Sequence, residues 1–288
     1  MNILSCHSSV AMGSVGNSGA AFALRRLGHE TWPINTVALS NHPAHGGFRG
    51  RVTPAAEIAD LVQGLAERGA LARCDAVLSG YLGAPEQGPA IADAVAAVRA
   101  ANPRALWLLD PVIGDGDGAD GRIYVKPGIA EFLRDRAVRE ADILTPNAFE
   151  LAFLSGIKSD STATALDAID SLRTRSRSAT AVVVVTGLRL RDGTPGEIAM
   201  VAVEPSAAWR ISVPYIDHPA HGAGDLFAAV LLARLLGGDP LSAAVAHAAA
   251  AVHGIIARTG TGAADLALVA AQEELVSPRR HVDPVRLR

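Results

Sequence analysis

The stretch ALWLLDPVIG, residues 105–114, is the clearest guide to the fold. Its apolar residues follow one another without alternation, and the run ends at Asp110 and Pro111. A continuous apolar run is typical of a strand that is buried on both faces of a parallel sheet. A polar residue directly after such a strand lies at the carboxyl edge of the sheet, where α/β proteins gather their ligand sites. The stretch therefore predicts a parallel sheet with Asp110 at its functional edge.

Strand-like and helix-like segments alternate on both sides of this stretch. Further strands are predicted at 2–6, 30–37, 74–79, 141–147 and 180–188. Helices are predicted at 16–28, 54–69, 88–102, 126–139, 148–156 and 165–176. Asn17 or Ser18 is expected to cap the first helix. The runs 198–204 and 208–214 predict a hairpin, the one clearly antiparallel stretch, and the chain from 223 to about 275 is expected to be helical.

This alternation predicts a doubly wound, mostly parallel central sheet with helices on both faces. We expect a single domain spanning residues 1–288, with a flexible, basic and solvated tail from about residue 277. The 288 residues are 49% hydrophobic, which is enough to build a large core. A net charge of −3 gives no reason to expect nucleic acid or a membrane surface as a partner.

The two cysteines, Cys6 and Cys74, are too few and too far apart for a disulfide framework, which favours a reducing, cytoplasmic location. The N-terminus lacks the pattern of a signal peptide, and the apolar runs are interrupted by Arg or His before they reach membrane-spanning length. Several common catalytic and nucleotide motifs are missing as well: there is no GxxxxGK[ST], HExxH, GxSxG or CxxC. The glycines of GSVGNSG (13–19) and GAGDLF (222–227) do not have the GxGxxG spacing of a dinucleotide site.

The second informative stretch is HPAHGAGDLFAA, residues 218–229. Gly222, Ala223 and Gly224 open an apolar helix, where unpaired backbone N–H groups and the helix dipole favour an anion. Asp225 lies one residue further, and a carboxylate beside an anion is unfavourable unless it has a task such as accepting a proton. The alternative is a tight turn followed by an ordinary acidic residue in the first turn of a helix.

Three stretches together resemble the ribokinase-like superfamily: DPVIGDGDG (110–118), TPNAFELAFLSG (145–156) and HGAGDLFAA (221–229). The N-terminal half narrows the resemblance, because WPINTVALSNH (32–42) and SGYLG (79–83) are similar to the pyridoxal kinases. The resemblance covers nearly the whole chain. It implies a homodimer, and pyridoxal and ATP as the substrates. It also implies Mg²⁺ as a cofactor, with a monovalent cation as a further candidate.

The resemblance also assigns roles to individual residues. It makes Asp225 the catalytic base and the backbone amides of residues 222–224 the anion hole. The acids that would organise Mg²⁺ through water are Asp110 and Glu150. The other ATP-binding positions are Thr145, Asn147, Thr186, Val213, Pro214, Tyr215 and Ile216. The substrate-binding positions, besides Asp225, are Ser8, His42, Pro43 and Tyr81.

Several of these positions have simpler explanations. Glu150 can be the last residue of a capping box, since TPNAFE is a capping sequence in its own right. Tyr81 can be a core aromatic, and Ser8 can serve loop hydrogen bonding. Some pyridoxal kinases have Thr in place of Pro43 and Lys in place of Thr186. The glycine-rich loop that includes residues 114–121 is expected to close over the site.

The resemblance implies ATP-dependent phosphorylation of pyridoxal at its 5′-hydroxyl. One alternative is a kinase of the same fold that acts on hydroxymethylpyrimidine. Another is a non-catalytic carrier of vitamin B6 that has kept the pocket. Asp225 argues against the carrier, because a protein that only binds gains nothing from a carboxylate beside a phosphate site.

Overall fold

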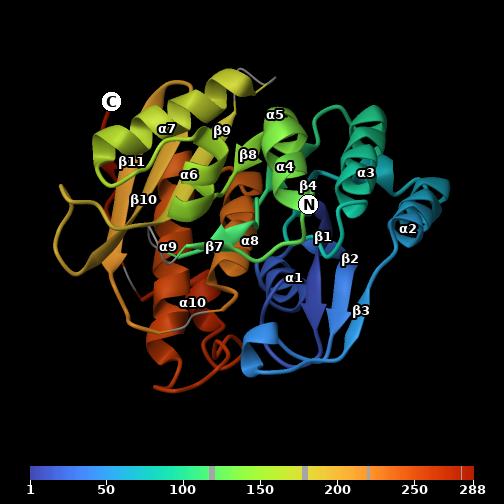
Figure 1. Ribbon diagram of the computed structural model, residues 1–288, viewed down its shortest axis with the longest axis horizontal. Coiled ribbons are helices and arrows are strands. Elements are labelled where there is room, and N and C mark those ends of the chain that lie inside the picture. Colours follow the sequence, from blue (N-terminus) through green and yellow to red (C-terminus); the bar gives the residue numbers. More distant parts are fainter. Residues whose placement is uncertain (117–120, 177–180, 219–220, 280) are drawn as a thin grey trace.

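The fold is described from a computed structural model, in which residues 1–116, 121–176, 181–218, 221–279 and 281–288 are described. Across these residues ten strands form one sheet, in the order β12-β11-β10-β9-β8-β5-β4-β1-β2-β3 (Figure 1). The strands of this sheet are β1 (Asn2–Val10), β2 (Glu30–Leu39), β3 (Gly50–Val52), β4 (Ala76–Ser79), β5 (Leu106–Leu109), β8 (Ile143–Leu144), β9 (Val182–Leu188), β10 (Glu197–Glu204), β11 (Ala207–Pro214) and β12 (Val285–Arg286). A separate short pair is formed by β6 (Gly114–Asp115) and β7 (Arg122–Ile123).

The middle of the sheet is parallel: β2, β1, β4, β5, β8 and β9 all run in the same direction. The strand in the stretch 105–114 is β5, which lies between β4 and β8. Its side chains alternate between two cores, because Trp107 belongs to one hydrophobic cluster and Leu108 to the other. The predicted doubly wound, mostly parallel sheet is therefore confirmed.

The helices cover both faces of the sheet. One core packs against α2 (Ala55–Glu67), α3 (Gln87–Ala101), α4 (Ile129–Phe132), α6 (Ala148–Ser155) and α7 (Thr162–Arg175). The other core packs against α1 (Asn17–Arg26), α8 (Ala223–Leu236), α9 (Leu241–Arg258) and α10 (Glu273–Val276). The remaining helical segments are η1 (Pro43–His45), η2 (Leu71–Arg73), the π-helical η4 (Leu133–Ala137) and α5 (Val138–Glu140). The helix predicted at 126–139 is thus three consecutive segments.

Several local predictions are wrong. The hairpin of β10 and β11 is confirmed, but it is not the one antiparallel stretch: β10 also pairs antiparallel with β9, β3 with β2, and β12 with β11. The helical region from 223 stops at Arg258, because glycines at 260 and 262 break it before the short α10.

The cap of α1 is also different from the prediction. Gly16 is the N-cap residue, with no side-chain cap. The amide nitrogen of Asn17 instead donates to the carbonyl oxygens of Ser5 and Ile34, at 3.2 and 3.1 Å. Ser18 donates to the carbonyl of Val10 at 2.7 Å. Both side chains therefore connect α1 to the strands, since buried strand carbonyls need partners more than the helix end does.

The tail from about residue 277 was predicted to be flexible and solvated; its last eight residues are exposed or partly exposed, and some of them also contact the sheet. Val285 and Arg286 pair with β11, and Leu287 packs against the core. Arg288 closes the chain with an ion pair to Asp170 at 2.7 Å. The sheet edge at β11 is thereby covered by the end of the chain itself.

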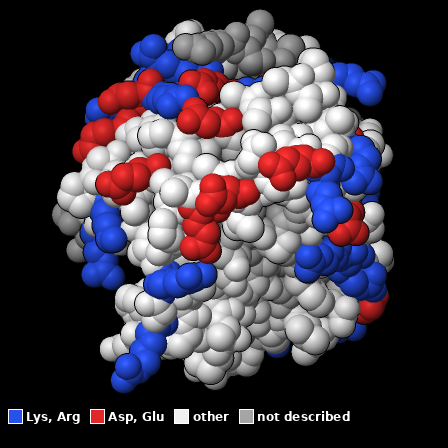
Figure 2. All heavy atoms as spheres, turned by 90° about the vertical axis from the view of Figure 1, so that its right-hand side faces the viewer, with Lys and Arg blue, Asp and Glu red and all other residues white. Residues whose placement is uncertain are grey.

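Within the described residues, α9 is long and apolar enough to cross a membrane by length and composition, contrary to the sequence-based expectation, and half of it is buried in this structure. Figure 2 shows acidic and basic side chains interspersed over one face of the molecule. Cys6 and Cys74 are buried and unpaired, as the cysteine count predicted.

Candidate active site

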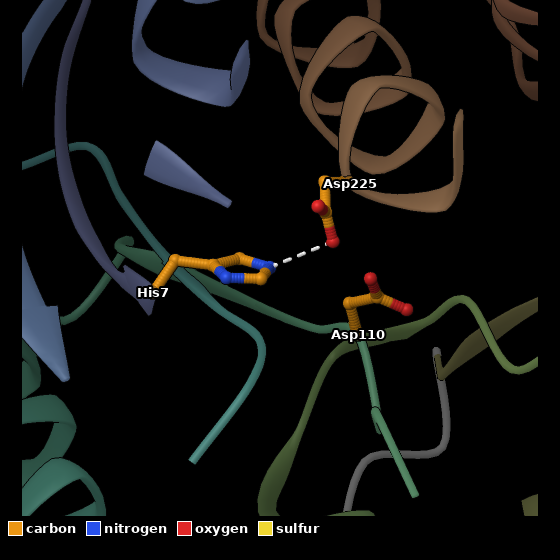
Figure 3. Close-up of side chains that lie close together, drawn as sticks. All are labelled: His7, Asp110 and Asp225. Atoms are coloured by element: carbon orange, nitrogen blue, oxygen red, sulfur yellow. Dashed lines mark ion pairs between the residues drawn. The ribbon is translucent and has the colours of Figure 1, made fainter. Parts of the chain in front are cut away.

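Three ionisable side chains converge at the carboxyl edge of the parallel strands (Figure 3). His7 comes from β1, Asp110 from the residue after β5, and Asp225 from the first turn of α8. Their nitrogen and oxygen atoms lie within 4.8 Å of one another. Asp110 and Asp225 were expected at this edge, whereas His7 was not singled out by the sequence.

The carboxylate of Asp225 is held from two sides. Its Oδ1 lies 3.1 Å from Nε2 of His7, and its Oδ2 accepts the backbone N–H of Gly16 at 2.6 Å. Asp110 is almost completely buried and accepts a hydrogen bond from the hydroxyl of Thr145 at 3.2 Å. Two carboxylates in a confined space repel each other, so at most one of them ionises easily without a cation.

The pKa directions follow from this arrangement. Burial and the neighbouring charge of Asp225 raise the pKa of Asp110 to about 7. Burial alone would raise the pKa of Asp225 too, but His7 and the N–H of Gly16 lower it below its usual value. Burial would lower the pKa of His7, but Asp225 and Asp110 raise it above its ordinary value. Of the two carboxylates, Asp225 is therefore the one that ionises more readily.

The helix start beside Asp225 has the geometry of an anion site. Gly222 is the N-cap residue of α8 with a φ of 90°, and a Cβ there would lie 2.6 Å from the carbonyl oxygen of Ser14. Only glycine fits this turn. The first backbone N–H groups of a helix have no partner within it, so those of Ala223 and Gly224 are available to a negative group.

A cavity of about 420 Å³ opens next to this helix start. It brings together six of the predicted ATP-binding positions, Asn147, Thr186, Val213, Pro214, Tyr215 and Ile216, with two of the predicted anion hole, Ala223 and Gly224. Asn147 and Thr186 are also joined directly by a parallel bridge. Thr145, Asp110 and Glu150 are not among its lining residues, because all three are buried behind it.

Glu150 is part of a capping box, as the simpler explanation predicted. Its Oε2 accepts the N–H of Asn147 at 2.9 Å, and Oδ1 of Asn147 accepts the N–H of Glu150 at 2.8 Å. Its Oε1 accepts the N–H of Ile113 at 2.9 Å. Burial and then Asp110 raise the pKa of Glu150 well above its usual value. Both oxygens are thus already occupied by backbone groups.

The predicted substrate positions are only partly gathered. Ser8 follows His7 directly, and its backbone N–H donates to Nδ1 of His7 at 2.8 Å. His42 and Pro43 lie at the start of η1, where the His42 ring stacks on His221 with centroids 4.4 Å apart. Tyr81 is half-buried against the core, as its simpler explanation suggested. The glycine-rich loop expected to close over the site includes residues 117–120, which lie outside the described residues.

The sequence missed two groups of site residues. One is His7, whose only signal was a histidine inside a predicted strand segment. The other group lines the apolar part of the cavity. The spacing of its residues along a strand and a helix was the feature that could have predicted it. Ile198 and Met200 are two apart on β10, and Ala249, Val252 and Ile256 share one face of α9.

Comparison with known proteins agrees with this site. The family described as Phosphomethylpyrimidine kinase matches residues 66–266. The chain is 45% identical to "Pyridoxal kinase PdxY" of Rubrobacter xylanophilus, over 96% of this chain and 94% of that protein. It is 43% identical to the protein of the same name from Granulibacter bethesdensis, over 96% and 97%. Pyridoxal kinase from Leishmania donovani, solved in complex with ADP and pyridoxamine, superposes with a TM-score of 0.91 at 29% identity, covering 100% of this chain and 99% of that one.

The fold and the site define a kinase with the ribokinase-like fold. Within that class, the chain belongs to the pyridoxal kinase family, and the family model described as Phosphomethylpyrimidine kinase also matches it. The resemblance read from the sequence is thereby confirmed.

Proposed function

We propose that this chain transfers the terminal phosphoryl group of ATP to the 5′-hydroxyl of pyridoxal, giving pyridoxal 5′-phosphate and ADP. One observation carries the proposal: an ionised carboxylate, Asp225, lies one residue beyond amides that line the cavity at the start of α8. A terminal phosphate bound at Ala223 and Gly224 would lie next to this base. The printed names of the relatives supply the substrate pair.

The chemistry assigned to the residues is limited to proton transfer and charge stabilisation. Asp225 accepts the proton of the hydroxyl group while that oxygen forms its bond to phosphorus and ADP leaves. The amides at the start of α8 stabilise the charge on the transferred group. The adenine end would lie among the apolar residues of the cavity, near Val213 and Ile216.

We also propose Mg²⁺ as the cofactor, held through water by Asp110. Carboxylate oxygens are the ligands that Mg²⁺ prefers, and Asp110 is a buried carboxylate beside another one, which favours a cation nearby. When bound, Mg²⁺ would offset the charge of the phosphates. Glu150 was predicted to share this role; with both oxygens on backbone amides, we propose that it acts from behind, by fixing the segment of Asn147. A monovalent cation and a homodimer stay predictions of the resemblance, and a cytoplasmic location stays a prediction from the cysteine count.

A second candidate substrate is hydroxymethylpyrimidine, because the matched family is described as Phosphomethylpyrimidine kinase. The deciding experiment incubates the purified protein with ATP, Mg²⁺ and either pyridoxal or hydroxymethylpyrimidine, with the Asp225→Ala variant alongside. Product is followed by absorbance and mass, and ADP is measured separately. Pyridoxal 5′-phosphate from the wild type alone supports the proposal. A clear preference for the pyrimidine would replace it, and binding of pyridoxal without ADP formation would favour the carrier.

A further inference from the structure

We propose that His7 is a positioning residue for the base, one that holds the Asp225 carboxylate in place from β1. The inference rests on the proposed function, since it gives a role to a group that touches the base and not the substrate. His7 is 1% exposed, and a histidine that is buried so completely is unusual, so its place in β1 needs a reason.

The ring of His7 is oriented by the backbone. Its Nδ1 accepts the N–H of Ser8 at 2.8 Å, so in the neutral ring the proton lies on Nε2. Protonation of the ring leaves a hydrogen on Nε2 as well. Nε2 therefore presents an N–H in either state. Oδ1 of Asp225 lies 3.1 Å away, at ion-pair distance, and among the described residues Nε2 makes no hydrogen bond of regular geometry.

Space for this ring is provided by a glycine on the next strand segment. A Cβ at Gly80, directly after β4, would lie 1.9 Å from Nε2 of His7, a distance that no side chain tolerates. The carbonyl oxygen of His7 is also engaged, since the side-chain amide of Asn17 donates to it at 3.4 Å. The ring of His7 and its main chain are thus fixed from three sides. A residue that positions the Asp225 base has to be held rigidly in this way.

The effect on Asp225 follows from the charges that surround it. The groups facing His7 are Asp225 from α8 and Asp110 from the end of β5. Without His7, Asp225 would keep the hydrogen bond from the N–H of Gly16, and the titratable groups left near it would be Asp110 and His42. Repulsion between the two carboxylates would then favour the protonated base and free its orientation.

The test compares His7→Leu, which removes the donor, with His7→Gln, which retains an N–H donor. His247→Leu is the control, because His247 is a half-buried histidine that contacts the carbonyl of Leu275 and no residue of the site. We expect His7→Leu to lower kcat about 10- to 100-fold, with little change in KM for ATP. Its acid limb in the pH profile of kcat should shift to higher pH. His7→Gln should recover most of kcat, while His247→Leu should lower Tm at wild-type kcat.

Three results would overturn the assignment: wild-type kcat in His7→Leu, an unshifted pH profile, or His7→Gln as impaired as His7→Leu at equal Tm. Failure of the proposed function looks different, because the wild type itself would then form no pyridoxal 5′-phosphate. In that case the ring titration of His7 by NMR decides. Asp225→Asn must lower the pKa of the imidazole, and an unchanged value would reject the positioning contact.

Discussion

Two groups of histidines near the start of α8 have pKa values that are shifted in opposite directions. His7 lies inside β1, and its pKa is raised; His42 and His221 lie in loops, and their pKa values are lowered. Burial acts in the same direction on all three, because it disfavours the charged ring. The difference is the partner: His7 meets the carboxylate of Asp225, whereas His42 and His221 stack on each other. Burial therefore lowers the pKa of His42 and His221, whereas at His7 the carboxylates of Asp225 and Asp110 outweigh it.

The largest effect is expected from removing the charged partner of His7, the carboxylate of Asp225. Asp225→Asn keeps the shape of the side chain and deletes its charge. We expect turnover to fall by about 10²- to 10⁴-fold, the usual contribution of a general base. The pKa of His7 should fall as well, so that His7 comes to resemble His42. Steady-state assays and NMR titration of the imidazoles measure the two effects.

The control for this variant is Asp160→Asn, which removes a carboxylate that pairs with Arg191. It should leave both turnover and the pKa of His7 as they are. If the His7 pKa stays raised in Asp225→Asn, then Asp110 and not Asp225 sets the charge of His7.

Asp110 supplies the next largest effect, on stability. Its folded pKa of about 7 lies above the ordinary value of 3.8, so the folded state binds the proton more tightly. The stabilisation is fully present below about pH 4 and is lost as the pH rises through about 7. Three pKa units correspond to about 4 kcal/mol at most. Asp110→Asn should remove this part of the pH dependence.

The measurement is urea unfolding of both proteins at a series of pH values, without Mg²⁺ or nucleotide. The difference between wild type and variant should change across this range in the stated direction. A difference that stays constant with pH would show that Asp110 ionises normally.

The comparison also shows what the sequence could predict. The motifs at Asp110, Asp225 and residues 222–224 were recognisable because parallel strands end at one edge of the sheet, and a glycine-rich helix start is a local feature. His7 was not, because its contact joins residues 218 positions apart and no local spacing encodes it. The capping role of Glu150 was predictable because that contact is local. Its second bond, to Ile113, reaches across two segments and was not predicted.

The edges of the sheet were equally hard to foresee. β12 has two residues and pairs with β11 only because the chain end returns to the sheet. A short basic segment carries no periodicity, so its pairing depends on tertiary contacts that the local sequence does not encode. Asn17 was misread for a related reason: its local pattern is that of a cap, but buried strand carbonyls nearby are the partners it takes.

A smaller effect is expected where His7 meets Gly80. Gly80→Ala would place a methyl group 1.9 Å from Nε2 of His7, so the ring has to move. Overpacking of this kind costs about 1–3 kcal/mol. The displaced ring should also lose its contact with the carboxylate of Asp225, so kcat should fall together with the free energy of unfolding.

Gly64→Ala is the matched control, because Gly64 is an exposed glycine of α2 with no atom near its Cβ position. It should stabilise the protein by up to about 1 kcal/mol through helix propensity. If Gly80→Ala leaves kcat unchanged, the position of the His7 ring does not matter for the base.

The smallest expected effect concerns the stacked pair of His42 and His221. Their lowered pKa values mean that the folded state keeps the rings neutral, so their contribution is present above the ordinary value of 6.5 and is lost as the pH falls through the folded values. This is opposite in sign to His7, whose contribution is lost as the pH rises. His221→Phe retains a stacked ring without a titratable group, whereas His221→Ala removes the ring and should cost about 0.5–1.5 kcal/mol. Thermal melting between about pH 5 and 8 should show a weaker acid destabilisation in His221→Phe than in the wild type, and an identical pH dependence would mean that the pair is not what keeps these imidazoles neutral.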